Sequence, residues 1–492
     1  MTNLTHRPDE STATIPVRFR DSEIGQQSSP RESSIIPAMM SIVTVLVALI
    51  MGIRPVQDVD AWWHLKVGQF VLNGGAFVGP DPWVPFATKP FVLTQWLPEV
   101  IAFKGYEWFG LPAVAWLRCV GILFILSAIL WCTRRVADTV PALITALAAL
   151  AGTGGSLSER PQLVSFILLA VWLGASWRTA EDLRPRWWLI PLTWVWACSH
   201  GLWITGIGVG GIVITGLLLD RRINLRQAAR LMLVPISSLA VVALTPVGPR
   251  LLLAPFGFAE SAASFIQEWQ PPDLRSDVFA IITLILLAGA VMGWVRSASV
   301  PPWWQILLAA VAFVSTLAMG RTIAVGAIIS APLAAASLQR LRKSTPSDVG
   351  GKSIRRWGSL ILIASLVAAP VSMVIASKPS LTPEGLRPAL SAVPAGSVIL
   401  DDFGVSGWLL WAEPDLVPVI DLRSEIYSKE YFQAYRTAEQ VRAGWQAYVE
   451  RTNPAYALLR REAPLRLALQ EELHWTTVRE DPSGYVLLKA PR

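Results

Sequence analysis

The sequence predicts a polytopic α-helical membrane protein with about eleven transmembrane helices and a small C-terminal α/β domain. Its 492 residues are 53% hydrophobic and only 16% charged, whereas about a quarter of the residues of a soluble domain are charged. Apolar runs recur along the chain until about residue 376. Beyond that point strand-like and helix-like segments alternate, which is typical of an α/β domain.

The apolar runs are candidate spans, because crossing a bilayer takes about 20 apolar residues. They begin near Ile36, Leu111, Pro141, Leu163, Trp187, Leu202, Leu231, Val278, Trp303, Thr322 and Trp357. Those near residues 141, 187 and 303 are short. All three cysteines lie within or at the ends of apolar runs, so we expect them to be small buried hydrophobes.

The basic residues indicate the topology. Arginines and lysines concentrate in alternate loops, at residues 134–135, 178–186, 221–230, 296 and 340–356. Since cytoplasmic loops are rich in these residues, the alternation predicts a cytoplasmic N-terminus. Residues 55–110 and the C-terminal region then lie outside the cell. The net charge of +7 is scattered over these loops, so no nucleic-acid partner is expected.

Three regions follow from this reading. Residues 1–34 are rich in Ser, Thr, Pro and charge, and we expect a disordered cytoplasmic tail. Residues 35–376 form the multi-span domain, with the large outer loop at 55–110. Residues 377–492 form the extracytoplasmic α/β domain. The expected elements are a strand, turn and helix at 397–411, a strand at 416–427, an amphipathic helix at 428–452, a strand and helix at 454–475, and a hairpin at 475–489.

Polar residues gather where the spans reach the outer face. Ionisable groups near a bilayer are costly and therefore candidates for function. The first loop opens with "DVDAWWHLKVG", and later span ends carry "SERPQ", "CSHG", "QEW" and "MGRT". The residues expected to meet in one outer cavity are Asp58, Asp60, Trp62, Trp63, His64, Asp81, Gln95, Glu99, Glu159, Arg160, Gln162, His200, Glu268, Trp269 and Arg321.

Several of these residues have simpler interpretations. Tryptophans at span ends, such as Trp62 and Trp63, most often belong to an interfacial belt. Arg321 either snorkels or pairs with a carboxylate, and His200 suits a helix-packing hydrogen bond. Asp81, between two prolines, is typical of a turn. The Asp421–Arg423 region, at a strand end, favours turn chemistry or a salt bridge.

Asp58 and Asp60 are the strongest catalytic candidates. In an extended segment, the alternation of side chains would put both carboxylates on one side. A neighbouring carboxylate, an imidazole and limited solvent all change proton affinity, as a general base requires. The spacing of Asp58, Asp60 and His64 makes a divalent metal possible without requiring one.

The passage "DVDAWWHLKVGQFVLNGGAFVGPDPW…TQWLPEV", with later blocks such as "QEWQPPD" and "VILDDFGVSGWLLW", resembles a large bacterial family of polytopic membrane proteins. That family is similar to the GT-C superfamily of membrane glycosyltransferases. The resemblance implies a bacterial plasma-membrane enzyme that moves a sugar from a polyprenyl-phosphate donor to an extracytoplasmic glycan, lipid or protein acceptor, with membrane lipid around it and inversion at the anomeric carbon.

Physical roles follow from that chemistry. Asp60 is the first choice for the base that accepts the proton of the acceptor hydroxyl, and Asp58 is the second. The leaving phosphate needs cations or hydrogen-bond donors, for which the candidates are Arg160, Arg321, His64, Lys66 and His200. Trp63 and Trp269 could stack on sugar rings, and Gln162 and Glu268 complete the predicted substrate site. The alternatives are a lipid or solute transporter and a non-catalytic cell-envelope assembly protein.

Overall fold

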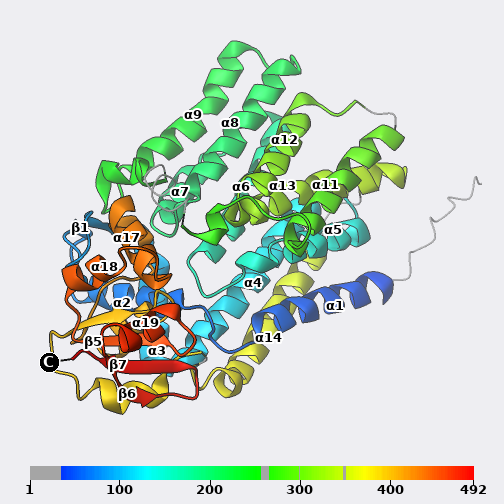
Figure 1. Ribbon diagram of the computed structural model, residues 1–492. Coiled ribbons are helices and arrows are strands. Elements are labelled where there is room, and N and C mark those ends of the chain that lie inside the picture. Colours follow the sequence, from blue (N-terminus) through cyan, green and yellow to red (C-terminus); the bar gives the residue numbers. More distant parts are fainter. Residues whose placement is uncertain (1–34, 256–264, 298–299, 347–350, 380, 492) are drawn as a thin grey trace, which may run out of the picture.

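The computed structural model describes residues 35–255, 265–297, 300–346, 351–379 and 381–491, without the side chains of residues 351–354. The predicted N-terminal tail therefore lies outside the described residues. Figure 1 shows a long helical bundle with a smaller sheet-containing domain at one end. Among the described residues, seven helices are long and apolar enough to cross a membrane. They are α1 (Ile35–Gly52), α4 (Leu111–Thr133), α6 (Gln162–Asp182), α9 (Leu225–Val242), α11 (Val278–Arg296), α13 (Ile323–Leu341) and α14 (Gly351–Ile375).

Four shorter apolar helices complete the bundle. They are α5 (Thr139–Gly152), α7 (Leu189–Ala197), α8 (Trp203–Leu219) and α12 (Trp303–Ala318). Every one of the eleven predicted runs is thus helical, and the runs near residues 141, 187 and 303 are short, as their sequences indicate. The chain is a polytopic α-helical membrane protein.

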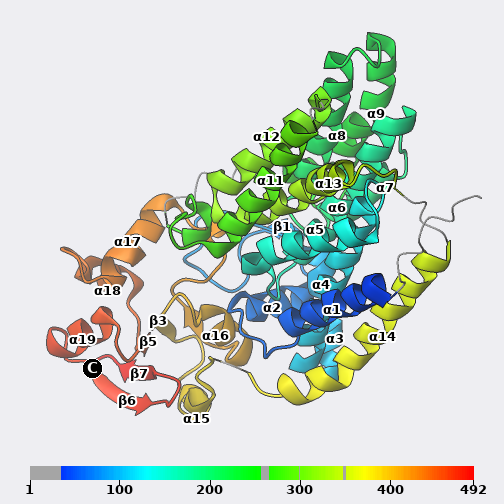
Figure 2. The same ribbon diagram turned by 90° about the vertical axis from the view of Figure 1, so that its right-hand side faces the viewer.

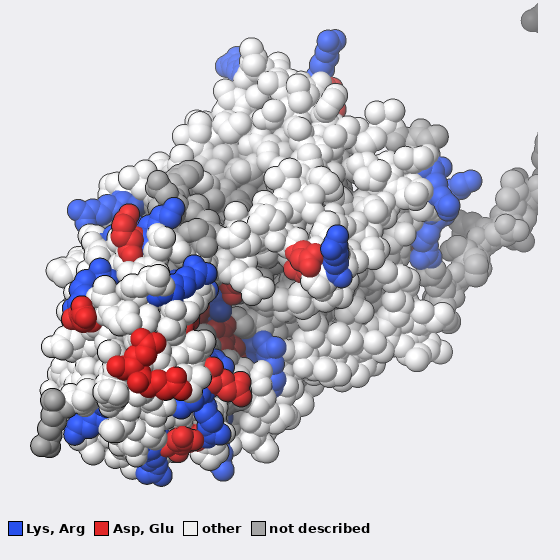
Figure 3. Space-filling model, viewed as in Figure 1, with Lys and Arg blue, Asp and Glu red and all other residues white. Residues whose placement is uncertain are grey.

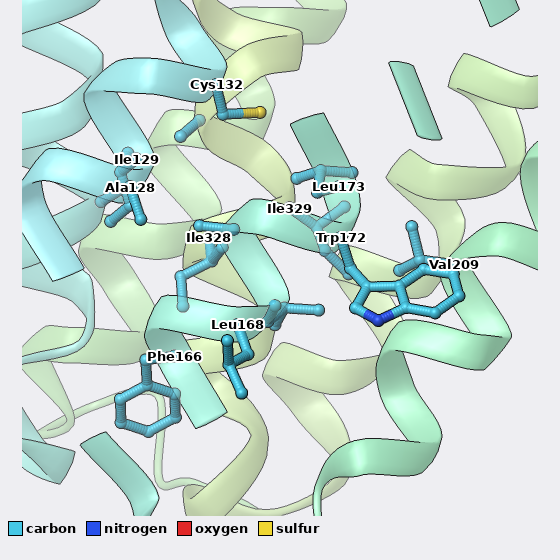
Figure 4. Packing of buried hydrophobic residues seen from close by; sticks show 14 of the residues in the cluster. Ala128, Ile129, Cys132, Phe166, Leu168, Trp172, Leu173, Val209, Ile328 and Ile329 are labelled. Carbon is cyan, nitrogen blue, oxygen red and sulfur yellow. The ribbon is translucent and has the colours of Figure 1, made fainter. Parts of the chain in front are cut away.

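The helices differ in how deeply they are buried. In the span that contains α13, 89% of the residues are buried inside the protein, against 22% for α1 and 28% for α14. α13 is therefore the central helix, while α1 and α14 lie at the edge and expose apolar side chains such as Ile50 and Leu366. Figure 4 shows the packing around the bundle core, where Trp172 meets Val209, and Ile328 and Ile329 face Leu168 and Leu173. The three cysteines are free and buried, as expected.

The loop between α1 and α4 is itself folded. It contains α2 (Asp60–Leu72), the antiparallel pair β1 (Val78–Gly79) and β2 (Phe91–Val92), and α3 (Trp96–Phe109). α2 and α3 pack closely, because Gly68 lies so near the carbonyl oxygen of Glu99 that any side chain at position 68 would overlap it. This contact fixes the helix that begins with Asp60.

The C-terminal domain is built on a mixed five-stranded sheet in the order β4-β3-β5-β7-β6. β3 pairs in parallel with β4 and β5, whereas β7 is antiparallel to β5 and β6. The strands are β3 (Val398–Asp401), β4 (Val417–Pro418), β5 (Tyr456–Arg460), β6 (Thr476–Glu480) and β7 (Tyr485–Lys489). The helices are α15 (Arg387–Leu390), α16 (Ser406–Ala412), α17 (Lys429–Glu439), α18 (Gln446–Thr452) and α19 (Pro464–Glu471).

These elements confirm the predicted α/β pattern with two changes. The strand expected over 416–427 is only two residues long before the chain turns. The single helix expected over 428–452 is two helices, because the backbone is left-handed at Val441 (φ 50°) and Gly444 (φ 82°). A left-handed residue cannot continue a right-handed helix, so α17 ends before this point.

The first loop and the C-terminal domain share one apolar core. Trp62, Ala61 and Leu65 of α2 pack with Trp408 and Leu409 of α16. A Cβ added to Gly407 would lie 2.9 Å from the carbonyl oxygen of Val59, so α16 is in close backbone contact with the residue that precedes α2. The interfacial-belt interpretation of Trp62 and Trp63 is therefore wrong, since both indoles are buried inside the protein. Figure 2 shows α16 and α2 side by side at the junction.

Charge is distributed unevenly over this architecture. Figure 3 shows a helical surface that is mostly uncharged, with acidic and basic residues concentrated on the C-terminal domain and in the hollow beside it. Lys and Arg reappear at the ends of the bundle away from that domain. The start of α1 also lies at the end opposite the domain (Figure 1).

Candidate active site

A cavity of about 470 Å³ with polar side chains in its wall lies where the bundle, the first loop and the C-terminal domain meet. Its walls come from several separate parts of the described chain. The lining includes Asp60, Trp63 and His64 from α2, Arg160 and Gln162 before and in α6, His200 before α8, Glu268, Trp269 and Arg321 from two 3-10 turns, and Ser424 and Glu425 from the C-terminal domain. A cavity of this size is typical of small-ligand sites.

Arg160 is the centre of an ionic network in this cavity. Its Nε lies 2.6 Å from Oδ2 of Asp58 and 3.0 Å from Oδ2 of Asp60. Its Nη2 donates to Oδ1 of Asp58 at 3.2 Å, and its Nη1 donates to both carboxylate oxygens of Glu268. All three nitrogens of the guanidinium therefore have carboxylate partners. This network joins three segments that are more than 90 residues apart in the sequence.

The two aspartates converge on Arg160 by a route that differs from the predicted one. The segment is not extended: Oδ1 of Asp58 accepts the backbone N–H of Asp60, and Asp60 is the first residue of α2. Asp58 thus holds the backbone at the start of the helix, and Asp60 lies in the first turn, where the helix dipole favours negative charge. Nε1 of Trp63 donates to Oδ1 of Asp60 at 3.0 Å and fixes the carboxylate from the next turn.

The environments of the two carboxylates separate their proton affinities. Burial and the neighbouring charge of Asp58 raise the pKa of Asp60, whereas the charge of Arg160 lowers it. The resulting pKa of Asp60 is about 6. Burial would also raise the pKa of Asp58, but the charge and hydrogen bonds of Arg160 outweigh burial and lower it below its usual value. Near neutral pH Asp58 is a fixed anion, while Asp60 accepts and releases protons.

Glu268 connects this network to a second cation. Its Oε2 lies 3.8 Å from Nε of Arg321, whose guanidinium carbon lies 5.1 Å from the centre of the Trp269 ring. The 3-10 turns that carry these residues, Gln267–Trp269 and Gly320–Thr322, are joined by the bond from the N–H of Gly320 to the carbonyl of Gln270. Arg321 pairs with a carboxylate, as one of the two simpler interpretations proposed, and its ion pair is longer than any contact of Arg160.

Two histidines face the cavity, and each has one ring nitrogen engaged. Nδ1 of His64 lies 2.7 Å from Oε1 of Glu99, a buried carboxylate on α3. Nδ1 of His200 lies 2.9 Å from the hydroxyl of Ser165 on α6. His200 therefore makes the packing hydrogen bond expected of it and also lines the cavity.

The C-terminal domain supplies one wall through a buried ionic clamp, which consists of Arg423, Asp81 and Asp421. Nη1 of Arg423 lies 2.6 Å from Oδ2 of Asp81 in the first loop, and Arg423 also pairs with Asp421. Asp81 acts as the predicted turn former as well, because its Oδ1 accepts the N–H groups of Trp83 and Val84. The clamp fixes the short segment that brings Glu425 to the cavity.

Glu425 was not among the predicted site residues. Burial raises its pKa to about 7. Glu99 of the first loop was expected in the cavity, but it is absent from the lining and instead contacts Nδ1 of His64. In the sequence "DLRSEIY" nothing distinguishes Glu425 from a surface acid at a strand end, because its position depends on the clamp and on the docking of the domain.

Several predicted residues do not line the cavity, among them Asp58, which pairs with Arg160 but is absent from the lining. Lys66 is absent from the cavity lining, because it lies on another face of α2, where the nearest opposing charge is Asp415 of the C-terminal domain. Glu159 turns the other way and pairs with the buried Arg118 of α4, whose remaining donors reach the carbonyl oxygens of Gly52, Arg54 and Pro55. Glu159 therefore ties α4 to the end of α1 and leaves Arg160 as the site residue of "SERPQ".

The side chains around Asp58 and Asp60 are arranged around an arginine in the described structure. Within the described ranges, no group of three or more His, Cys, Asp or Glu side chains is arranged to hold a metal ion. The guanidinium of Arg160 occupies the position between the two aspartates, and Nδ1 of His64 is directed to Glu99. The cation already present between the two carboxylates is an arginine.

Comparisons with known proteins locate this architecture among solved structures. No family profile matches the sequence. No curated protein matches it either. The structure resembles the Archaeoglobus fulgidus oligosaccharyltransferase in the apo form, with a TM-score of 0.52 and 12% identity over 86% of this chain and 70% of that one. It also resembles ArnT from Cupriavidus metallidurans in the apo state, with a TM-score of 0.50 and 14% identity over 93% and 99% of the two chains.

The chain shares its overall fold with these two proteins. ArnT from the same organism bound to undecaprenyl phosphate gives a TM-score of 0.47 at 14% identity, over 94% and 100% of the two chains. In this protein the cavity lies at the end of the bundle that carries the α/β domain, and the first loop forms one side of it.

Proposed function

We propose that this protein is a membrane glycosyltransferase that moves a sugar from a polyprenyl-phosphate donor to a hydroxyl group of an extracytoplasmic acceptor. The observation that carries the proposal is Asp60. It is a carboxylate with a pKa of about 6 that lines a 470 Å³ cavity and is held by Arg160 and Trp63. The fold is shared with ArnT, a protein that has been crystallised with undecaprenyl phosphate, and with an oligosaccharyltransferase.

Asp60 is the proposed general base. The acceptor oxygen forms a bond to the anomeric carbon while its proton passes to the Asp60 carboxylate. The bond between that carbon and the phosphate oxygen breaks, and its electron pair stays on the polyprenyl phosphate. A single displacement of this kind inverts the anomeric centre. A base with a pKa near the working pH is well matched to this proton transfer. Asp58, held as an anion by Arg160, positions that arginine.

Arg321 is the better candidate to bind the leaving phosphate. Arg160 already faces Asp58, Asp60 and Glu268 through all its nitrogens, so it has little capacity for another anion. Arg321 has one long ion pair and lies against Trp269. Arginine suits phosphate because its forked donors match the phosphate oxygens. Trp63 and Trp269, both at the cavity wall, are the proposed stacking surfaces for the sugar.

The proposed orientation puts the cavity outside the cell. Apart from those on the C-terminal domain, many of the visible Lys and Arg side chains lie at the ends of the bundle away from that domain (Figure 3). Cytoplasmic loops are rich in these residues. Activated lipid-linked sugars on that outer side then reach the cavity from the membrane. A transporter would instead carry its charged residues near the bilayer midplane, whereas the charged residues of this cavity lie at one end of the bundle.

The test uses membranes that contain either the wild-type protein or Asp60→Asn, with a panel of radiolabelled polyprenyl-phosphate sugars. We expect label to move from the lipid to an acceptor in the wild type, and this transfer to disappear in Asp60→Asn at equal protein level. Glu107→Gln is the matched control, because Glu107 is an exposed acid of the same loop that pairs only with Lys104. Transfer that survives in Asp60→Asn would remove Asp60 from the role of base.

A further inference from the structure

The two histidines of the cavity have different hydrogen-bond environments. Nδ1 of His64 lies 2.7 Å from Oε1 of Glu99, and both side chains are buried. An ionised carboxylate only accepts hydrogen bonds, so Nδ1 of His64 carries a proton. In a neutral imidazole the other nitrogen then has no proton. When Glu99 is ionised and His64 is neutral, Nε2 of His64 is therefore a hydrogen-bond acceptor.

His200 has the opposite arrangement. The backbone N–H of Leu202 points to its Nδ1 at 3.3 Å, and a backbone N–H can only donate. The hydroxyl of Ser165 lies 2.9 Å from the same nitrogen. That hydroxyl accepts Nε1–H of Trp196 at 2.7 Å, which leaves its own proton free to donate to His200. Nδ1 of His200 is an acceptor, so its proton is on Nε2.

The two rings also belong to different ends of the cavity. His64 follows Asp60 by four residues on α2, so both side chains are on the same face of that helix. Arg321 is separated from Asp60 by two intervening residues, since Asp60 pairs with Arg160, Arg160 with Glu268, and Glu268 with Arg321. His200 is held by Ser165 of α6, and Arg321 is the charged group that acts most strongly on it. One end of the cavity therefore combines the acceptors Asp60 and His64. The other combines the donors Arg321 and His200.

We propose that these opposite tautomers divide the cavity into a hydroxyl end and a phosphate end. His200 donates from Nε2 to the phosphate of the lipid, beside Arg321. His64 accepts a hydrogen bond from a hydroxyl of the acceptor, beside Asp60. Glu99 is a positioning residue, because it touches no substrate and acts by fixing the proton of His64. This inference rests on the proposed function and adds which end of the cavity binds the phosphate and which binds the acceptor hydroxyl.

The first experiment measures binding of undecaprenyl phosphate, with undecaprenol as the uncharged comparison, to purified protein in nanodiscs. His200→Leu removes the proposed phosphate donor, and we expect roughly tenfold weaker binding of the phosphate and no change for the alcohol, the size expected for a hydrogen bond to a charged group. His200→Gln keeps an N–H donor, so it should retain part of the affinity. Glu99→Gln should bind undecaprenyl phosphate as the wild type does.

The second experiment measures sugar transfer with the donor that is active in the wild type. In Glu99→Gln the amide can donate to Nδ1, which allows the other tautomer of His64, so we expect a roughly tenfold lower rate with unchanged phosphate binding. Glu99→Asp keeps a carboxylate and should restore part of the rate. His64→Gln gives the same separation of rate from binding if Glu99→Gln reduces the amount of folded protein. Glu107→Gln, on the same helix as Glu99, is the control.

The outcomes separate this inference from the function on which it rests. If wild-type protein shows no preference for undecaprenyl phosphate over undecaprenol, the proposed function fails and the inference fails with it. If the wild type binds the phosphate but Glu99→Gln weakens that binding as much as His200→Leu does, the division of the cavity is wrong and the glycosyltransferase proposal stands.

Discussion

Replacing Arg423 by Met is expected to undock the C-terminal domain from the first loop. The Arg423 side chain is fully buried between Asp81 and Asp421, which are equally inaccessible, and lies over the rings of Trp83 and Phe91 at 4.7 Å each. Met fills a similar volume but leaves two buried carboxylates without a cation. Breaking a buried ion pair by removing one partner costs about 3–5 kcal/mol. If the first loop and the C-terminal domain (residues 55–110 and 377–492) unfold as one unit, 3 kcal/mol corresponds to roughly 6–12 °C in the unfolding temperature.

The pH dependence of this loss has a definite sign. Burial raises the pKa of Asp421, and in the wild type Arg423 opposes that rise. Without Arg423 the folded-state pKa of Asp421 moves further above the unfolded value, so folding favours its protonated form. The stability of Arg423→Met should therefore fall as pH rises, in addition to any change shared with the wild type.

The assay is thermal unfolding of the purified protein in detergent, followed by size-exclusion chromatography with fluorescence detection at pH 5.5 and pH 8. These pH values are about one and a half and four units above the usual aspartate pKa. Arg461→Met is the control, because Arg461 and its partner Glu480 are both about half exposed and such pairs contribute at most about 1 kcal/mol. The triple variant Arg423→Met with Asp81→Asn and Asp421→Asn should recover most of the loss. Equal unfolding temperatures for Arg423→Met and Arg461→Met, or no recovery in the triple variant, would refute the reasoning.

Three further outcomes are expected. The transfer rate should rise with pH through about 6 as Asp60 loses its proton. In Arg160→Gln the midpoint of this rise should move to higher pH, because the charge of Arg160 lowers the pKa of Asp60. A pH–rate profile of the wild type and the variant measures both effects. Gly407→Val should lower both the unfolding temperature and the transfer rate, since the valine side chain would displace the carbonyl of Val59 and with it the start of α2. If neither quantity falls, this close contact does not position α2. Transfer should be insensitive to EDTA, because Arg160 already lies between Asp58 and Asp60, and a rate restored only by added Mg²⁺ or Mn²⁺ would contradict this.

The helical framework could be predicted from the sequence because hydrophobicity is a local property. Each span is an apolar run that can be recognised without knowing its neighbours, and all eleven predicted runs are helical. The strand and helix order of the C-terminal domain was also predictable, since side-chain alternation and turn residues act over a few positions. The left-handed break at Val441 escaped prediction, because valine rarely adopts that conformation.

The sequence by itself determined which residues are costly to keep near a membrane, and it determined that they gather at span ends. Asp60, Arg160, Glu268 and Arg321 were recognisable for that reason. The pairing among them was decided only by tertiary structure, because a charge interacts with whatever lies within a few ångströms, irrespective of sequence separation. Thus neighbouring Glu159 and Arg160 separate, one to Arg118 and one to the cavity, while Asp81 and Arg423 come together from opposite ends of the chain.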